Sequence, residues 1–376
     1  MVITEVVVEI VNVPLAVRFQ SSLGTKAGTT RTVVRLRSDD GVEGFGETMR
    51  GKPVADLVRT LSPDLIGSDP FDIELLLSGL KMTPFFFGYI GYAAIAAIEM
   101  ACFDLMGKRL GVPVASLIGG YFRREVPVTA LATRAMVEGS SSVDLPIRLS
   151  EAIQPVIERY GFSTLKVKGS SDAQSDLAIM EAIRVAQPGL KLRIDPNGAW
   201  TVNETIRSAS RLESLDLEYL EDPCGGLEGM ARVRQKVRIP LCTNMCIVRE
   251  AEFAPGVRLG AVDVIHGDVH KWGGIVANKR LAALCEAFGL GMNLHSGGEL
   301  GISTACHLHL AAATPEIRYA IDSMYYLLQD DILGEPLRVS GGVMAVPTGP
   351  GLGVTIDEPK LRHYAAQNER DGDYPS

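Results

Sequence analysis

The sequence predicts an α/β protein with a parallel sheet, because short apolar runs alternate with amphipathic helical stretches from about residue 126 onward. Two such helical stretches are DAQSDLAIMEAIRVAQ at 172–187 and GGIVANKRLAALCEAFG at 273–289. The candidate strands between them end in polar residues at intervals of 23 to 27 residues, which is the length of one strand, one helix and two short loops. Eight strands at this spacing predict a modified (β/α)8 barrel of the TIM type.

Eight runs are the candidate strands, and their ends are the predicted site. The runs are VPVTALA, TLKVK, LKLRID, LEYLE, IPLCTN, AVDVIHGD, LGMNLH and IRYAID. An α/β protein often ends a strand in a polar residue for structural reasons alone, which would explain one or two of these positions. In a barrel, however, these ends converge on one face, where active sites lie. From the second strand on, the last polar residues are Lys168, Asp195, Glu221, Asn244, Asp268, His295 and Asp322.

Three regions follow from the change of pattern along the chain. The first 60 residues are rich in β-formers, with a tight turn at Asp40-Gly41, and helical periodicity then extends from about 54 to 110. We therefore expect an α+β capping domain over residues 1–124 and the barrel over 125–340. The Gly- and Pro-rich segment 341–376 is expected to return to the cap.

Composition limits the possible partners and the compartment. The 376 residues are 46% hydrophobic and 22% charged, and the net charge is −8, which argues against a nucleic-acid partner. The apolar run 89–106 contains Glu99 and Asp104, so it predicts a buried helix and not a membrane span. Six irregularly spaced cysteines and a start without a basic signal region predict a cytoplasmic protein. Cys242 and Cys246 form a CxxxC, but without a second pair a zinc site is disfavoured.

Two lysines stand two residues apart in TLKVKGS, at 164–170. Side chains alternate along a strand, so Lys166 and Lys168 point to the same face. A like charge and a nearby metal ion both lower the pKa of a lysine, so we expect Lys168 to act as a general base. Two surface lysines on an edge strand are the alternative, which the position at the barrel mouth disfavours.

Asp195, Glu221 and Asn244 end three consecutive predicted strands and offer oxygen ligands. Two carboxylates and a carboxamide suit Mg2+ at octahedral geometry, with positions left for water and substrate. Each residue alone could instead be structural: Asp195, followed by Pro196 and Asn197, could simply initiate a turn. Together they predict a magnesium site.

Asp268 and His295 end two neighbouring predicted strands across the barrel. The carboxylate can accept a hydrogen bond from one ring nitrogen and leave the other nitrogen for proton transfer. A metal flanked by Lys168 and His295 suits removal of the proton α to a carboxylate, because a side-chain base alone is too weak for that carbon acid. The second group then reprotonates the intermediate or assists departure of a β-hydroxyl.

Six motifs contain these residues: KVK at 166–168, DPNGAW from 195, LEDPCGG from 220, CTNM from 242, GDVHKWGGI from 267 and NLHSGGELGIS from 293. As a set they resemble the enolase superfamily, in the branch of mandelate racemase and the acid-sugar dehydratases. LEDPCG followed by TNM is most similar to the glucarate dehydratase subgroup.

The resemblance implies a role for each matched residue. Lys168 is one acid/base with Lys166 as its partner, and His295, oriented by Asp268, is the opposite base. It also implies that Asn197 and Asp322 contact substrate, and that Mg2+ is held by Asp195, Glu221 and Asn244. Relatives of this kind imply a homo-oligomer.

The implied function is a Mg2+-dependent acid-sugar dehydratase, a carbon–oxygen lyase acting on an aldarate or aldonate through an enediolate to a 2-keto-3-deoxy product. Gly297 and Gly298 stand where glucarate dehydratases carry amide side chains, which puts glucarate itself in doubt. A racemase or epimerase working through the same intermediate is one alternative. A barrel kept for binding without catalysis is another, which the complete set of metal and base residues disfavours.

Two cap segments are candidates for substrate contact. SSLGTKAGTTR at 21–31 suits a mobile lid, and Lys26, Arg31 or Arg50 could meet a distal carboxylate; solvated cations are the alternative. We take Lys26 as the substrate-binding candidate. PFFFGYIGY at 84–92 is expected to form an aromatic wall or part of the cap core.

Overall fold

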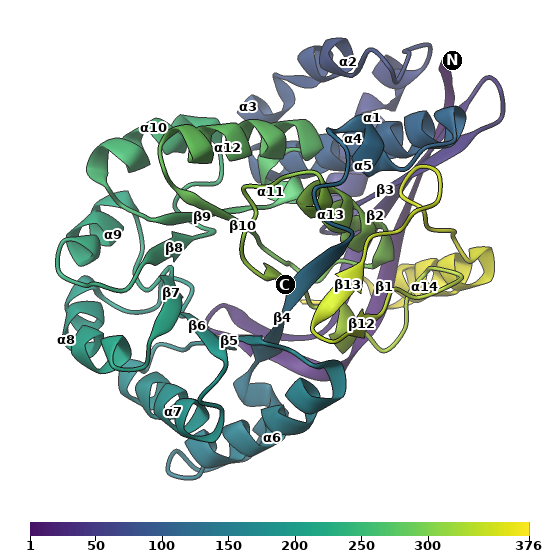
Figure 1. The fold of residues 1–376 in the computed structure, drawn as a ribbon. Coiled ribbons are helices and arrows are strands. Elements are labelled where there is room, and N and C mark those ends of the chain that lie inside the picture. The colour runs from purple at the N-terminus through teal and green to yellow at the C-terminus, as the bar shows by residue number, and fades with distance from the viewer. Residues whose placement is uncertain (376) are drawn as a thin grey trace.

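The computed structural model describes residues 1–375 and contains a cap and a barrel that pack against each other (Figure 1). The cap sheet is antiparallel and consists of β1 (Ile3–Ser21), β2 (Gly24–Ser38) and β3 (Glu43–Met49), in that order. Its helices are α1 (Lys52–Leu65), α2 (Ile73–Leu80), α3 (Thr83–Phe87), α4 (Tyr89–Leu110) and α5 (Val114–Leu117).

Helix α4 confirms the expected buried helix. It is long and apolar enough to cross a membrane, but 89% of its most apolar window is buried inside the protein. Glu99 and Asp104 on it are buried and accept backbone hydrogen bonds: Glu99 from Ile275 and Val276, and Asp104 from Phe45 and Leu352. The helix therefore connects the cap sheet, the barrel and the tail through buried hydrogen bonds.

A ring of eight parallel strands forms the barrel, and the helices that connect them lie outside it (Figure 1). Strand β11 pairs with β4, and a bridge from Met292 to Ile317 links the neighbourhood of β11 to β10, so the ring closes. The strands are β4 (Glu125–Ala132), β5 (Thr164–Lys168), β6 (Lys191–Asp195), β7 (Leu217–Glu221), β8 (Leu241–Thr243), β9 (Val264–Gly267), β10 (Gly291–Leu294) and β11 (Ile321–Asp322).

The helices outside the ring confirm the predicted α/β barrel, and the last unit makes it a modified one. After β11 the chain forms the 3-10 helix η2 (Tyr325–Leu327), where a regular repeat would place an α-helix. The 3-10 helix η1 (Arg134–Val137) follows β4. The outer helices are α6 (Leu145–Tyr160), α7 (Ala173–Ala186), α8 (Val202–Glu213), α9 (Leu227–Arg234), α10 (Glu250–Leu259), α11 (Val269–Trp272), α12 (Ile275–Ala287) and α13 (Gly301–Ala312).

The tail contacts the barrel before it reaches the cap. β12 (Val339–Ser340) and β13 (Val343–Ala345) form an antiparallel hairpin, and β13 pairs with the start of β4. Helix α14 (Glu358–Asp371) then packs on β1, and Asn368 donates to Asn12 over 3.0 Å. After α14 the chain ends within the outline of the barrel ring in this view (Figure 1).

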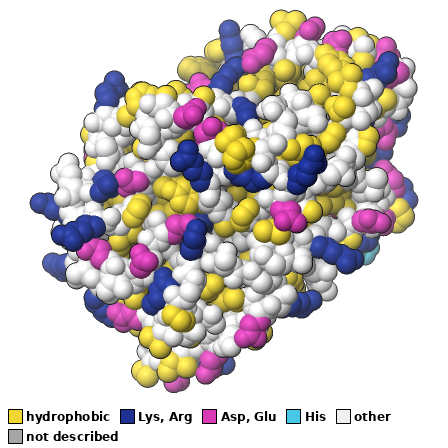
Figure 2. All heavy atoms as spheres, in the orientation of Figure 1, with side chains coloured by type: hydrophobic (Ala, Val, Ile, Leu, Met, Phe, Trp, Pro, Cys, Tyr) yellow, Lys and Arg dark blue, Asp and Glu magenta, His cyan; other side chains and the backbone are white. Residues whose placement is uncertain are grey.

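One expectation for the cap stays a prediction and one was wrong. The segment 21–31 is the tip of a long hairpin, because β1 and β2 pair from Ser21 and Gly24 onward across a two-residue turn, and its mobility as a lid stays a prediction. The aromatic segment forms neither a wall nor core, because Phe85, Phe86 and Phe87 are 77%, 70% and 53% exposed. They lie on the short helix α3, and Figure 2 shows hydrophobic side chains at the edge of the molecule where α2 and α3 lie.

Candidate active site

A cavity of about 570 Å³ lies at the carboxyl ends of the barrel strands, beneath the cap. The barrel contributes polar residues from the ends of β5, β10 and β11 and from the loops after β6, β8 and β9, and the cap contributes the hairpin tip and the start of α1. Lys26 and Arg50 line the cap side. Among the predicted site residues, the lining includes Lys166, Lys168, Asn197, Asn244, His295 and Asp322.

Lys166 lies among three buried carboxylates. Its Nζ is 2.6 Å from Glu221 Oε2, 2.7 Å from Asp322 Oδ2 and 3.2 Å from Asp195 Oδ2. Burial would lower the pKa of Lys166, but the three carboxylates outweigh it and raise that pKa well above its ordinary value. The ammonium of Lys166 is therefore fixed and charged, and it joins β5, β6, β7 and β11 at the floor of the cavity.

Lys168 shares Asp195 with Lys166. Its Nζ lies 2.5 Å from Asp195 Oδ2 and 3.4 Å from Asn197 Oδ1, and the side chain is 8% exposed to the cavity. Asn197 adopts a left-handed backbone with φ of 53° and donates its own N–H to Asp195 Oδ1. That turn after β6 places both oxygens of Asp195 toward defined donors.

Asn244 completes the trio from the loop after β8. Its Nδ2 donates to Glu221 Oε1, and its Oδ1 accepts from Lys271 Nζ over 2.9 Å. The expected strand IPLCTN ends one residue earlier, at Thr243, because the Asn244 N–H leaves the sheet and donates to Asp222 Oδ2 over 2.7 Å. Asp195, Glu221 and Asn244 are thus brought together, each at most 3% exposed.

His295 and Asp268 face each other across β10 and β9, with Nδ1 3.0 Å from Asp268 Oδ2. Burial would raise the pKa of Asp268, but His270, Lys271, His307 and backbone N–H groups together hold it below its ordinary value. Burial, followed by the charges of Lys271, Lys166 and Lys168, lowers the pKa of His295 well below its ordinary value. The imidazole is therefore neutral, and a hydrogen on Nδ1 leaves Nε2 free to accept a proton.

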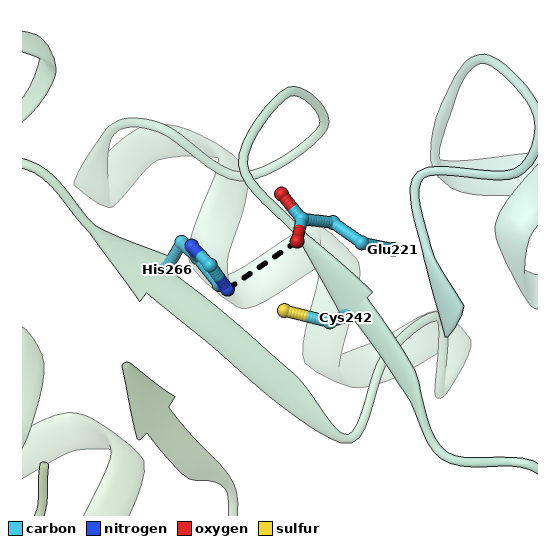
Figure 3. Close-up of side chains that lie close together, drawn as sticks. All are labelled: Glu221, Cys242 and His266. Atoms are coloured by element: carbon cyan, nitrogen blue, oxygen red, sulfur yellow. Dashed lines mark ion pairs between the residues drawn. The ribbon is translucent and has the colours of Figure 1, made fainter. Parts of the chain in front are cut away.

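Beneath this layer, Glu221, Cys242 and His266 lie together inside the barrel (Figure 3). His266 Nε2 is 3.6 Å from Glu221 Oε2 and 3.0 Å from the hydroxyl of Tyr219. Burial would raise the pKa of Glu221, but His266 and Lys166 lower it to about 2, so this carboxylate is ionised. Cys242 therefore faces the ring interior with these two side chains, apart from the loop that carries Cys246.

The cap cations differ in their freedom. Arg31 is 1% exposed, and its guanidinium is held by Glu47 Oε1 at 2.6 Å and by His270 Nε2 at 2.8 Å. Burial and the charges of Arg50, Arg31 and Lys168 lower the pKa of Lys26. Lys26, Arg31 and Arg50 all line the cavity, but Arg31 is held in place by Glu47 and His270 at the cap–barrel junction.

Comparison with known proteins places this geometry in a family. Residues 3–119 match the model of the mandelate racemase/muconate lactonizing enzyme N-terminal domain, and residues 148–360 match the enolase C-terminal domain-like model. The chain belongs to the enolase superfamily. It is therefore an enzyme of the mandelate racemase and muconate lactonizing enzyme branch, as the six motifs predict.

Three relatives illustrate the range within this superfamily. A probable glucarate dehydratase of Streptomyces coelicolor is 36% identical over 89% of this chain and 84% of its own. An isomerase of Streptomyces coelicolor A3(2) has a crystal structure that is 59% identical, covers 99% of both chains and superposes with a TM-score of 0.94. An enolase of Pseudomonas fluorescens Pf0-1, solved with magnesium, potassium and tartrate, is 30% identical over 100% of this chain and 95% of its own, with a TM-score of 0.92.

Mg2+ is the characteristic cofactor of the superfamily, and the donor set in this chain fits it. Two carboxylates and one carboxamide converge from β6, β7 and the loop after β8, all buried. Hard oxygen donors of this kind match a small divalent cation. The Asn244 side chain is in contact with Glu221 through Nδ2, and its Oδ1 faces Lys271, so the amide would turn its oxygen to the ion on binding.

Sequence reasoning missed two residues of this enolase-superfamily site. Asp222 accepts from the Thr243 hydroxyl at 2.5 Å as well as from the Asn244 N–H, so it orients the loop after β8. Lys271 donates to both the backbone and side-chain oxygens of Asn244 and lines the cavity. The motif GDVHKW offered one signal, a cation three residues after Asp268.

Proposed function

We propose that this protein is a Mg2+-dependent acid-sugar dehydratase, a hydro-lyase that converts an aldonate or aldarate to its 2-keto-3-deoxy product. The observation that carries the proposal is one cavity lined by Lys168, His295 and Asn244, with Asp195 and Glu221 in contact with the lysines of its lining. The probable glucarate dehydratase among the relatives supports the same class.

Asp195, Glu221 and Asn244 would hold the metal ion. When bound, Mg2+ supplies the positive charge that acidifies the carbon next to a substrate carboxylate. Lys166 provides a second, permanent cation at the cavity floor, because three carboxylates keep it protonated. Negative charge that develops on the substrate carboxylate is thereby stabilised.

Neutral His295 takes the α-proton on Nε2 while Asp268 holds Nδ1–H, so the imidazole becomes an imidazolium beside a buried carboxylate. The same Nε2–H then delivers that proton to the β-hydroxyl as its C–O bond breaks, and water leaves. The enol product ketonises to the 2-keto acid. Lys168 is placed to remove the α-proton from the opposite face of a substrate of the other configuration.

Asn197, Asp322 and Lys26 are the proposed substrate contacts, and all three line the cavity. Asn197 contacts Lys168, and Asp322 contacts Lys166. A substrate held by Asn197 and Asp322 would therefore lie next to both lysines. Lys26 is available to an anionic or hydroxyl-bearing distal group.

The test is an assay of the purified protein with Mg2+ against mono- and diacid sugars, reading the 2-keto product. A product with one acid, abolished by chelation, supports the proposal. Exchange of the α-proton for deuterium in D2O, without formation of 2-keto product from any acid that binds, would contradict the proposal.

Racemisation or epimerisation is the second candidate, because two bases facing one carbon from opposite sides can invert it. The isomerase that is 59% identical to this chain supports this alternative. Deuterium incorporation accompanied by a change of configuration, with no loss of water, would identify it.

We further propose a cytoplasmic homo-oligomer whose partner is a small carboxylate. The six cysteines all lie within the described residues and are free thiols, which suits a reducing compartment. The exposed Phe85, Phe86 and Phe87 offer an apolar surface for self-association. Light scattering on the eluting protein gives the mass; a monomer at micromolar concentration would contradict the oligomer.

A further inference from the structure

The segment after helix α14 contributes to the cavity. Asp373, Tyr374 and Pro375 line it together with the hairpin tip and the start of α1, although they are more than 300 residues away in sequence from both. The cavity is thus bounded by three separate pieces of chain on its cap side.

Two glycines of the cap form the contact with this segment. A Cβ at Gly28 would lie 2.3 Å from Cε2 and 2.6 Å from Cζ of the Tyr374 ring, and a Cβ at Gly51 would lie 2.2 Å from Asp373 Oδ1. Gly28 has no positive φ, so backbone freedom does not require glycine there. Close approach of the tail does require it, because any side chain would displace Tyr374 or Asp373.

Hydrogen bonds fix the same segment to the cap. The Tyr374 N–H donates to Thr30 Oγ1 over 2.8 Å, and Asn12 Nδ2 donates to the Gly372 carbonyl over 2.7 Å. Asp373 accepts from Asn368 Nδ2 at 2.9 Å and from the Lys52 N–H at 3.3 Å. The segment 372–375 is therefore seated on both β2 and the start of α1, and its position depends on both.

We propose that residues 372–375 form the outer wall of the substrate cavity and that Tyr374 limits the length of the acid that the enzyme accepts. This inference rests on the proposed function for the class of substrate, a polyhydroxy acid with its carboxylate end at Lys166 and Lys168. The far end of the acid meets the Tyr374 ring, so each added carbon beyond the fitting length is rejected by contact. Tyr374 is a specificity residue and takes no part in the chemistry.

The experiment measures binding, not turnover, of aldonates of four to eight carbons by calorimetry on the Mg2+-loaded full chain, with His295→Asn as the common background of every protein compared so that a bound acid is not dehydrated. With Tyr374 present, binding is expected to weaken sharply beyond one chain length. In Tyr374→Ala, the ratio between the Kd of the next longer acid and the Kd of the longest well-bound acid should fall by about tenfold, which is the effect of one carbon in a fitted pocket. Tyr374→Phe keeps the ring and should keep the same length limit. A length profile that is flat with Tyr374 present, absence of binding at every length, or a profile unchanged in Tyr374→Ala would overturn the proposal.

Gly28→Ala provides an independent variant. It should displace the ring and reproduce the Tyr374→Ala profile, and the double variant Gly28→Ala/Tyr374→Ala should show no further change, because both act on one contact. Gly79→Ala is the matched control, since a Cβ there meets nothing within 4 Å and the residue lies on α2, outside the cavity. Thermal melts of each variant confirm folding. Additive effects of Gly28→Ala and Tyr374→Ala would count against the proposal.

The two proposals fail in different ways. If the protein binds acids with a length limit set by Tyr374 but yields no 2-keto product, the dehydratase proposal is wrong and the proposal for residues 372–375 is supported. If it dehydrates acids but Tyr374→Ala leaves the length profile unchanged, the proposal for residues 372–375 is wrong and the dehydratase proposal is supported.

Discussion

His295 Nδ1 lies 3.0 Å from Asp268 Oδ2, and this carboxylate also accepts the N–H groups of His270 and Lys271 through its other oxygen. Asp268 is thus held in place by backbone donors while it orients the imidazole. Asp268→Asn keeps the volume but removes the charge and permits the other tautomer. We expect kcat to fall by about 10³- to 10⁴-fold with little change in melting temperature. An unchanged kcat would remove Asp268 from the mechanism.

His295→Asn is expected to lower turnover by about 10²- to 10⁴-fold for an acid whose α-proton faces His295. Lys168→Ala is expected to have an effect of the same size on an acid of the other configuration, because each variant removes the base on one face of the cavity. The readouts are 2-keto product and α-proton exchange in D2O, with circular dichroism to confirm the fold. Lys191→Ala and His363→Asn are matched controls at exposed positions and should behave as wild type. Near-wild-type turnover in a site variant excludes that residue as an essential base.

Asp222→Asn is expected to weaken Mg2+ binding by about 10- to 100-fold, because Asp222 orients the proposed ligand Asn244. Asp222 accepts hydrogen bonds from the Thr243 hydroxyl and the Asn244 N–H, and the NH2 group of an asparagine could not accept either of them. Calorimetric titration of Mg2+ into the metal-free protein measures this affinity. Asp216→Asn is the control, because Asp216 also has a left-handed backbone, with φ of 49°, but is exposed. Equal affinity in Asp222→Asn and wild type would show that the loop after β8 is positioned by other contacts.

The barrel and most of the site were predictable because each signal was local. A polar residue at the end of an apolar run predicts its own position at the strand end, and the regular spacing of Lys168, Asp195, Glu221 and their successors predicts that the ends meet. Their convergence does not require knowledge of any side-chain conformation.

The missed features depend on geometry that no short pattern contains. Asp222 follows Glu221 directly, so strand alternation predicts that it points away from the cavity, but its φ of 35° turns the chain and directs it to Asn244. Gly28 and Gly51 appear in sequence as ordinary glycines, and only the returning tail shows why a side chain is excluded. The exposed Phe85 was missed for a different reason: the hydrophobicity of a side chain predicts burial, but it does not indicate which part of the chain could cover it.

The buried histidine His309 should make stability depend on pH. Its Nδ1 accepts from the Ala115 N–H and its Nε2 donates to the Leu352 carbonyl, and burial lowers its pKa from 6.5 to about 4. The unfolded chain therefore takes up this proton first as pH falls, so the stabilisation is present above pH 6.5 and is lost toward pH 4.

Between about pH 7.5 and pH 5, we expect wild type to lose about 2 kcal/mol more unfolding free energy than His309→Gln. Urea unfolding at the two pH values measures the difference. His363→Gln, at an exposed histidine on α14, should follow wild type. Parallel losses in wild type and His309→Gln would show that His309 titrates alike in the folded and unfolded states.

The Arg31–Glu47 pair should stabilise the cap–barrel junction. The two residues lie diagonally on β2 and β3, where Arg31 faces Met49 and Glu47 faces Val33, and both are at most 1% exposed. Glu47 also accepts from the N–H groups of Leu300 and Ser303 in the barrel. Arg31→Met leaves this buried carboxylate without its cation, so we expect a loss of about 3–5 kcal/mol in urea unfolding.

Adding Glu47→Gln to Arg31→Met should recover part of that loss, because the amide oxygen still accepts a backbone N–H and no charge remains buried. Arg211→Met is the control, since its ion pair with Glu181 is exposed and such pairs contribute at most about 1 kcal/mol. Equal stability of the single and double variants would mean that the carboxylate of Glu47 is already neutral in the Arg31→Met protein, and that the junction is held by packing and hydrogen bonds instead of by charge.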